Sequence, residues 1–207
     1  MFFRGFILGI VVAVLVGCGV VYFGLTRGAI PANADAKPSP LERWAAGTSL
    51  HATLDRDAPK GANPVAANDD NLKAGVQLYA THCTVCHGTA AGDSSATPIA
   101  KGENPKPPQL ASEGVEDDPE GWTFWKIKHG IRWSGMPAWQ HVLNDQEIWT
   151  LTLFLKRMDN LPPAAKAAWQ AVQAGHATGG PGQGTDQGTD QGKDEGTDQG
   201  AQQPGKD

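Results

Sequence analysis

The stretch Thr81–Gly88 holds the residues of this chain whose types and spacing could do chemistry. Cys83 and Cys86 are separated by two residues, and His87 follows the second cysteine directly. Two thiols and an imidazole at this spacing suit three kinds of site: covalent attachment of a haem, half of a zinc site, or a redox-active disulfide. The rest of the sequence has to distinguish among these three.

A zinc site and a redox disulfide both lack the context that they need. A structural zinc site needs a second pair of ligands, but the third cysteine, Cys18, lies in a distant apolar run, and no paired histidines follow at zinc-finger spacing. A thioredoxin-like disulfide needs a strand–helix–strand context, whereas the sequence shows helical periodicity and no convincing strand. Haem attachment is therefore the favoured interpretation.

Haem attachment assigns a role to each residue of the motif and requires a ligand on the other side of the iron. Cys83 and Cys86 would form thioethers with the haem, and His87 would bind its iron from one face. Two methionines remain after Met1: Met158 falls on the apolar stripe of an expected helix, where it reads as core, and Met136 lies in a Gly-Met-Pro turn. Since proline restricts the backbone beside it, the turn can hold a thioether in place, and we assign Met136 as the second axial ligand.

The elements that position these residues are expected to be helices. One helix is expected over about 71–82, another from about 118 to 129, and a last one from Asn144, where Asn144 and Glu147 have capping-box spacing. The stretch 88–112 is rich in Gly and Pro and is expected to be an irregular loop. The apolar stripe expected on the last helix comprises Ile148, Leu151, Leu155 and Met158, with Phe154 beside it.

With these elements in place, the chain over about 68–160 resembles a class I c-type cytochrome. The resemblance rests on "CTVCHG", on "SGMPAW" and on the two terminal helices, and it implies an all-α, small helical cytochrome c fold around one covalent haem c with its iron. It further implies that Gly75 and Tyr79 of the first helix cross Leu151 and Phe154 of the last. More closely, the stretches similar to bacterial membrane-anchored monohaem cytochromes are "IAKGENPKPPQL", "FWKIKHGIRWSGMPAW", "IWTLTLFLKRM" and, ahead of the domain, "ERWAAGTSLHATLDRDAP".

The resemblance also implies a partner for the histidine. In this family a proline carbonyl in the loop after the motif accepts a hydrogen bond from the ligating imidazole, which fixes the orientation of the ring. Pro107 or Pro108 in "PKPPQL" matches that position, and Pro108 is our assignment; Pro98 is the competitor.

The N-terminal segment is expected to be a membrane anchor. Gly5–Leu25 runs for 21 residues without a charge, long enough to span a bilayer as a helix. One alternative stays open: "LVGC" resembles a lipoprotein cleavage box in which Cys18 is lipidated, although the apolar run continues past Cys18. A buried helix of a soluble protein is not expected at this length and apolar purity. The expected organisation is an anchor over 1–28, a linker over 29–67 with a short amphipathic helix at 41–54, the cytochrome domain at 68–160, a trailing helix at 161–176 and a tail over 177–207.

The tail explains most of the acidity of the chain. From Thr178 onward there are six acidic residues and two lysines, in a four-residue Gly-Thr-Asp-Gln pattern with almost no apolar content, which predicts disorder. A calcium-binding repeat is the alternative, although its hydrophobic positions are missing. The body of the chain is nearly neutral and has no basic run, so a nucleic-acid partner is not expected.

Filled axial positions predict electron transfer and leave no open site for a substrate. We therefore expect an electron carrier, not an enzyme by itself, which shuttles single electrons between respiratory proteins from the periplasmic side of a bacterial inner membrane. Two alternatives stay open: a cytochrome subunit fixed in a larger oxidoreductase or oxidase complex, and a haem sensor or peroxidase in which Met136 dissociates. Lys126, Lys128 and Arg132 are candidates for a weak docking patch, and Trp122, Trp125 and Trp133 are candidates for the walls of the haem pocket.

Overall fold

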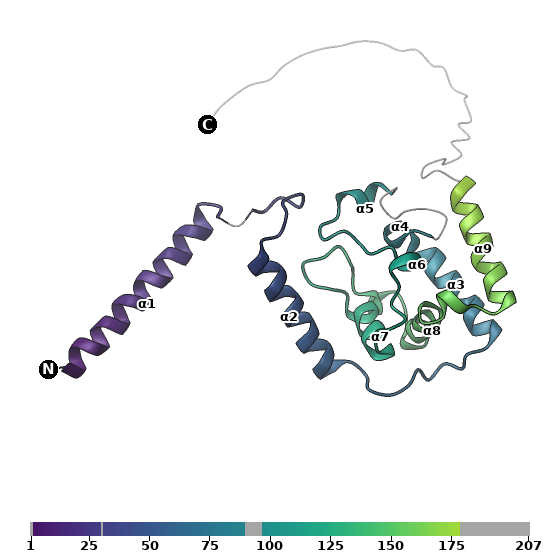
Figure 1. Ribbon diagram of the computed structural model, residues 1–207, viewed down its shortest axis with the longest axis horizontal. Helices are drawn as coiled ribbons and strands as arrows, with labels where there is room; N and C mark the ends of the chain where they lie inside the picture. Colours follow the sequence, from purple (N-terminus) through teal and green to yellow (C-terminus); the bar gives the residue numbers. More distant parts are fainter. Residues whose placement is uncertain (1, 30, 90–96, 179–207) are drawn as a thin grey trace, which may run out of the picture.

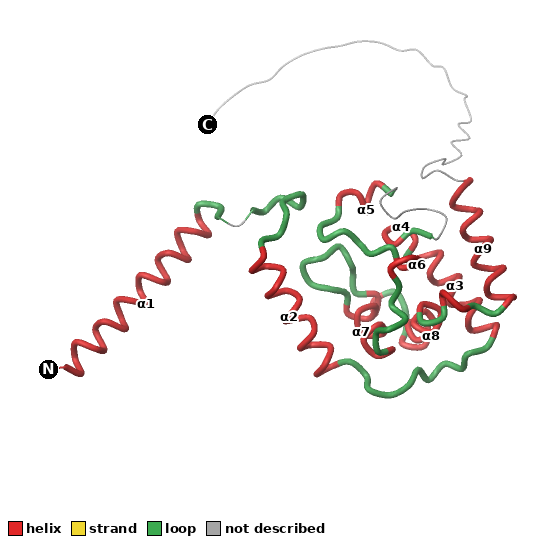
Figure 2. The backbone as a smooth tube through the Cα atoms, viewed as in Figure 1, coloured by secondary structure: helices red, strands yellow, loops and turns green. Residues whose placement is uncertain are grey.

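The computed structural model describes residues 2–29, 31–89 and 97–178, and in these residues the regular structure is helical, without strands (Figure 2). The all-α expectation is therefore confirmed. In chain order the helices are α1 (Phe2–Thr26), α2 (Pro40–Asp57), α3 (Asp69–His82), α4 (Thr84–His87), α5 (Pro98–Gly102), α6 (Leu110–Glu113), α7 (Glu120–His129), η2 (Trp139–His141), α8 (Asp145–Leu155), η3 (Met158–Asn160) and α9 (Pro163–Thr178).

The crossing of α3 and α8 is the centre of the fold. A Cβ atom added to Gly75 of α3 would lie 2.5 Å from the Cβ of Phe154 and 2.8 Å from the carbonyl oxygen of Thr150, both on α8. The absence of a side chain at Gly75 therefore lets the two helix backbones approach closely. Tyr79, one turn further along α3, and Phe154 are fully buried, with their rings edge to face at 5.6 Å.

The C-terminal helix α9 adds a third aromatic ring to this crossing. Trp169 of α9 is 5 % exposed and packs edge to face against both Tyr79 and Phe154, with ring centroids 5.3 Å and 5.4 Å away. In Figure 1, α9 lies along the side of the bundle opposite α2. The trailing segment is thus part of the core, because its main aromatic side chain completes the cluster at the helix crossing.

Residues 90–96 of the loop after the motif lie outside the described residues, and residues 97–112 are more ordered than their Gly and Pro content predicts. The loop contains the short helices α5 and α6, so the expectation of a wholly irregular segment was wrong in part. Thr97 caps α5 by accepting a hydrogen bond from the backbone N–H of Ala100, and Pro98 occupies the first helical turn, where its missing N–H costs nothing. Proline here begins a helix instead of preventing one.

Helix α2 docks on the domain with a different face from the one that its sequence suggests. Leu41, Trp44, Ala45 and Leu50 were expected on its apolar side, yet Leu41 and Trp44 are largely exposed. The buried positions are Leu54 and Ala58 at the C-terminal end, where the chain then passes so close to α7 that a Cβ on Gly121 would clash with the carbonyl of Pro59. Tertiary contact at one end of the helix outweighs its apolar stripe.

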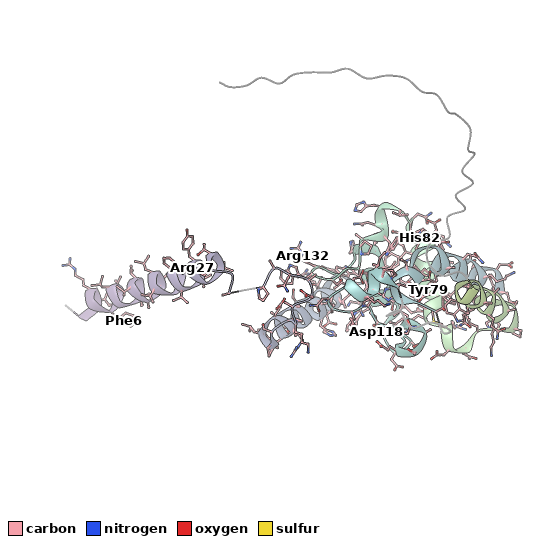
Figure 3. The ribbon with its side chains drawn as sticks, turned by 90° about the horizontal axis from the view of Figure 1, so that it is seen from above. Phe6, Arg27, Tyr79, His82, Asp118 and Arg132 are labelled. Carbon is pink, nitrogen blue, oxygen red and sulfur yellow. The ribbon has the colours of Figure 1, made fainter. Side chains whose placement is uncertain are left out.

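Helix α1 extends away from the bundle (Figure 1). Its apolar side chains are exposed along its length. Its stretch Phe3–Thr26 is long and apolar enough to cross a membrane. Figure 3 shows Phe6 near the outer end of α1 and Arg27 at the end that leads into the rest of the chain. This exposure distinguishes α1 from the buried core helix of a soluble protein.

Candidate functional site

The two motif cysteines lie on a single helical turn that continues from α3. The backbone N–H of Cys83 donates to the carbonyl of Tyr79 at 2.9 Å, and the N–H of His87 donates to the carbonyl of Cys83 at 2.8 Å. Gly88 ends this turn with a φ of 65°, a conformation that favours glycine. Both thiols are free and half-buried, and the local backbone therefore presents Cys83, Cys86 and His87 together.

The imidazole of His87 is oriented by a backbone carbonyl. Its Nδ1 lies 2.9 Å from the carbonyl oxygen of Pro108, so among the prolines considered from the sequence it is Pro108 that faces the histidine. If Nδ1 carries the proton, as a carbonyl partner requires, Nε2 keeps a free lone pair for a metal. The contact has the form of the outer hydrogen bond that orients metal-binding histidines.

Burial is the main influence on the pKa values of Cys83, Cys86 and His87. It lowers the pKa of His87, an effect partly opposed by the hydrogen bond to Pro108 and by the charge of Glu103. Because a histidine with a lowered pKa is neutral at neutral pH, His87 is in the form that can ligate iron. Burial also raises the pKa of Cys83 to about 12, and burial together with Glu103 raises that of Cys86 to about 11.

Glu103 is a residue of this site that sequence reasoning missed. Its Oε1 lies 3.5 Å from the Sγ of Cys86, and a Cβ added to Gly135 would lie 2.5 Å from its carboxyl carbon. The Glu103 side chain therefore spans from the motif to the loop that carries Met136. Nothing in the stretch "KGENP" singles out this glutamate, because its position depends on how the loop after α5 folds back.

The loop that carries Met136 is fixed by its own hydrogen bonds. Ser134 is the hub: its N–H and Oγ both donate to the carbonyl of Ile131, and its Oγ accepts from the N–H of Met136 at 3.1 Å. The N–H of Ile131 in turn donates to the carbonyl of Met136, and Gly130, with a φ of 67°, leaves no room for a Cβ against Met136 and Pro137. Met136 is half-buried against the core cluster that Cys83 also contacts.

A groove of about 630 Å³ separates α2 from this loop. The residues lining it come from α2, from the stretch Asn104–Pro105, from the stretch Gly130–Ser134 and from Trp125. Of the three candidate wall tryptophans, Trp125 and Trp133 line this groove, whereas Trp122 stacks edge to face with His51 of α2. The groove thus adjoins the backbone next to both Glu103 and Met136.

Two of the three candidate docking cations are occupied by ion pairs. Lys126 contacts Asp118 at 2.7 Å and Lys128 contacts Asp145 at 2.7 Å. Arg132, exposed on the Met136 loop, remains on the surface (Figure 3). The proposed basic patch therefore reduces to a single residue.

The donor set fits a haem better than a bare metal ion. Within the described part of the chain, no group of three or more His, Cys, Asp or Glu side chains is arranged to hold a metal. What the site does offer is two free thiols on one turn, an imidazole fixed through Nδ1 and a thioether on a rigid loop, which is the set that a covalently bound haem uses.

Comparison with known proteins agrees with this geometry. Residues 70–155 match the family model described as "Cytochrome C oxidase, cbb3-type, subunit III", a match that covers less than half of the chain. No curated protein matches the chain significantly. The matched segment contains the motif, the Met136 loop and the crossing of α3 and α8. Residues 70–155 are therefore a c-type cytochrome domain, consistent with class I, and such a domain implies covalently bound haem c with its iron.

Proposed function

We propose that this protein is a membrane-tethered electron carrier in which one haem c is held by Cys83 and Cys86 and ligated by His87 and Met136. The observation that carries the proposal is the 2.9 Å contact between Nδ1 of His87 and the carbonyl oxygen of Pro108. It leaves Nε2 as the coordinating atom and keeps the ring from turning. When bound, the haem supplies a one-electron iron couple, while the protein determines access and orientation.

The role of Met136 follows from its rigid loop. Hydrogen bonds through Ser134 and close packing at Gly130 hold the backbone of Met136 in one conformation. A thioether held in this way would bind the iron opposite His87 and would exclude external ligands such as oxygen or carbon monoxide. Electron transfer, which needs no open position, is therefore favoured over sensing or peroxidase chemistry.

Tethering follows from α1. Its length and exposed apolar surface favour a single span, with the haem domain on the periplasmic side of a bacterial inner membrane and redox proteins of that membrane as partners. Protease treatment of intact spheroplasts tests this topology. The haem domain should be degraded from outside, and its protection would contradict the proposed location.

A second candidate is a fixed subunit of a terminal oxidase, and it is favoured by the match to a family of subunits of cbb3-type cytochrome c oxidase. Purification in mild detergent distinguishes the two candidates by the mass at which the protein migrates and by the proteins that accompany it. A free carrier should migrate at its own mass, whereas a subunit should co-purify with catalytic partners in a constant ratio.

Carbon monoxide tests the filled sixth position in either setting. The reduced protein at neutral pH should show no spectral change when carbon monoxide is added. Rapid formation of a carbon monoxide complex would instead favour a sensor or peroxidase with a labile Met136.

A further inference from the structure

The first two turns of α2 carry two large apolar side chains that no described part of the chain covers. Leu41 is 70 % and Trp44 is 66 % exposed, and they lie three residues apart, on one face of the helix. The other end of the same helix is docked through Leu54, which is 0 % exposed. The exposed pair therefore lies at the free end of α2, whose other end is packed against the domain.

The outward direction of this pair is fixed by local hydrogen bonds. Ser39 and Glu42 form a capping box at the start of α2, and the Arg43 guanidinium donates to the carbonyl of Pro38 at 3.1 Å. The preceding linker is tied to the domain, because the side-chain amide of Asn104 donates to the carbonyl of Ala36. Helix α2 therefore does not turn freely to bury Leu41 and Trp44.

Local turns shorten the distance that the segment between α1 and α2 can span. Beyond α1, the N–H of Ala29 still donates to the carbonyl of Gly24, with Gly28 at a φ of 72°, and a new turn closes where the N–H of Ala36 donates to the carbonyl of Asn33. Four peptide units join Ala29 to Asn33 and four more join Ala36 to Pro40, so each of these two stretches spans at most about 14 Å. The connection therefore limits how far the start of α2 can lie from the end of α1.

We propose that Leu41 and Trp44 lie in the headgroup region of the same bilayer that α1 spans. The inference rests on the membrane anchorage proposed above. Tryptophan favours this region, because its ring is largely apolar and its N–H finds polar partners there. The headgroup layer is several ångströms deep on each side of the hydrocarbon core, and the connection is short enough to let the first turns of α2 lie in it.

The contact is apolar in nature, because the charges around it balance. Residues 27–57 contain four basic and four acidic side chains, listed here in chain order: Arg27, Asp35, Lys37, Glu42, Arg43, Asp55, Arg56 and Asp57. A segment without net charge gains little from anionic lipids. The contact should therefore form equally well on neutral and on anionic membranes.

This contact would hold the haem domain in a fixed orientation relative to the membrane. The side of α2 opposite Leu41 and Trp44 lines the groove that ends at the Met136 loop. A domain held at two points, α1 and the start of α2, samples fewer orientations than one on a free tether. The partners that this arrangement suits are redox proteins within the same membrane.

Site-directed spin labelling of the full-length haem protein tests the proposal. Leu41→Cys and Trp44→Cys would each be labelled in a Cys18→Ser background and reconstituted into phosphatidylcholine vesicles, with and without phosphatidylglycerol. Asp55→Cys is the matched control, since it lies on a similar face of α2 about 21 Å further along the helix. Val12→Cys, within α1, reports the span itself.

The ratio of label collisions with oxygen and with a water-soluble nickel chelate measures depth. Labels at Leu41 and Trp44 should be protected from the chelate several-fold more than the label at Asp55, to the same extent in both lipids. Equal chelate access at all three positions, with Val12 deep, would overturn the surface contact and leave the anchor intact. Full chelate access at Val12 would overturn the anchor, and the surface contact with it.

Discussion

Nδ1 of His87 lies 2.9 Å from the carbonyl oxygen of Pro108, a residue 21 positions further along the chain. This contact predicts a single tautomer of the imidazole in the haem protein, with the proton on Nδ1. In the reduced, low-spin protein the Nδ1–H resonance of His87 should be visible by NMR and should exchange with water more slowly than that of an exposed histidine. A rapidly exchanging Nδ1–H would contradict the assignment.

Replacement of Pro108 distinguishes the effect of its carbonyl oxygen from the effect of the rigid proline ring on the backbone. Pro108→Ala keeps the carbonyl oxygen but loosens the backbone, because alanine does not fix φ. We expect the variant to keep covalent haem and the Nδ1–H signal, with faster exchange of that proton. Pro98→Ala is the matched control and should leave the exchange rate unchanged.

The hydroxyl of Tyr79 stabilises the end of the motif. It is fully buried and donates to the carbonyl of Gly88 at 3.0 Å, and burial raises its pKa, so it remains a neutral donor at physiological pH. Tyr79→Phe leaves that carbonyl without this donor and should lower the free energy of unfolding by about 1–2 kcal/mol. Urea denaturation measures the loss, and Tyr22→Phe, in the exposed α1, should show none.

A methyl group at Gly75 should separate the two central helices. The added Cβ would lie 2.5 Å from the Cβ of Phe154, and both backbones would have to move apart. We expect Gly75→Ala to destabilise the protein by about 2 kcal/mol or more, as overpacking of a helix crossing does. Gly47→Ala is the control: no atom lies within 4 Å of its added Cβ, so the better helix propensity of alanine should make it neutral or slightly stabilising.

The ammonium group of Lys156 holds together the turn before α7. Its Nζ donates to the carbonyl oxygens of Val115, Glu116 and Asp118. Lys156→Met should cost about 1–3 kcal/mol, because it leaves partly buried carbonyls without their donor. Lys166→Met, on the exposed face of α9, should change the unfolding free energy by no more than about 0.5 kcal/mol. Equal stability of the two variants would remove Lys156 from this role.

Local sequence signals predicted the helical part of this fold well. Asn144 and Glu147 form the expected capping box of α8, and Gly75 and Tyr79 meet Phe154 at the crossing of α3 and α8, as the resemblance implied. These features depend on neighbours within a few residues or on a close approach that only glycine permits. The motif itself is a strong local signal, whereas the contact of His87 with Pro108, 21 positions away, was expected only from the resemblance.

The remaining features depend on contacts between distant segments. Leu41 and Trp44 form an apolar pair like that of any buried helix, and only the docking of Leu54 at the other end shows that they face outward. Glu103 is brought to Cys86 by the folding of the loop between them, which no periodicity describes. Residues 179–207 of the predicted disordered tail lie outside the described residues, so that expectation stays a prediction.

The central claim is that His87 and Met136 together ligate one covalent haem, and Met136→Ala tests it most directly. The measurement is the visible and electron paramagnetic resonance spectrum of the variant beside the wild type, at neutral pH in both oxidation states. The wild type should be low-spin in both. The variant should keep its covalent haem through Cys83 and Cys86 but become high-spin or exchange its ligand, and its reduction potential should fall, because the thioether that favours the reduced iron is lost. An unchanged low-spin spectrum and potential would contradict the assignment of Met136.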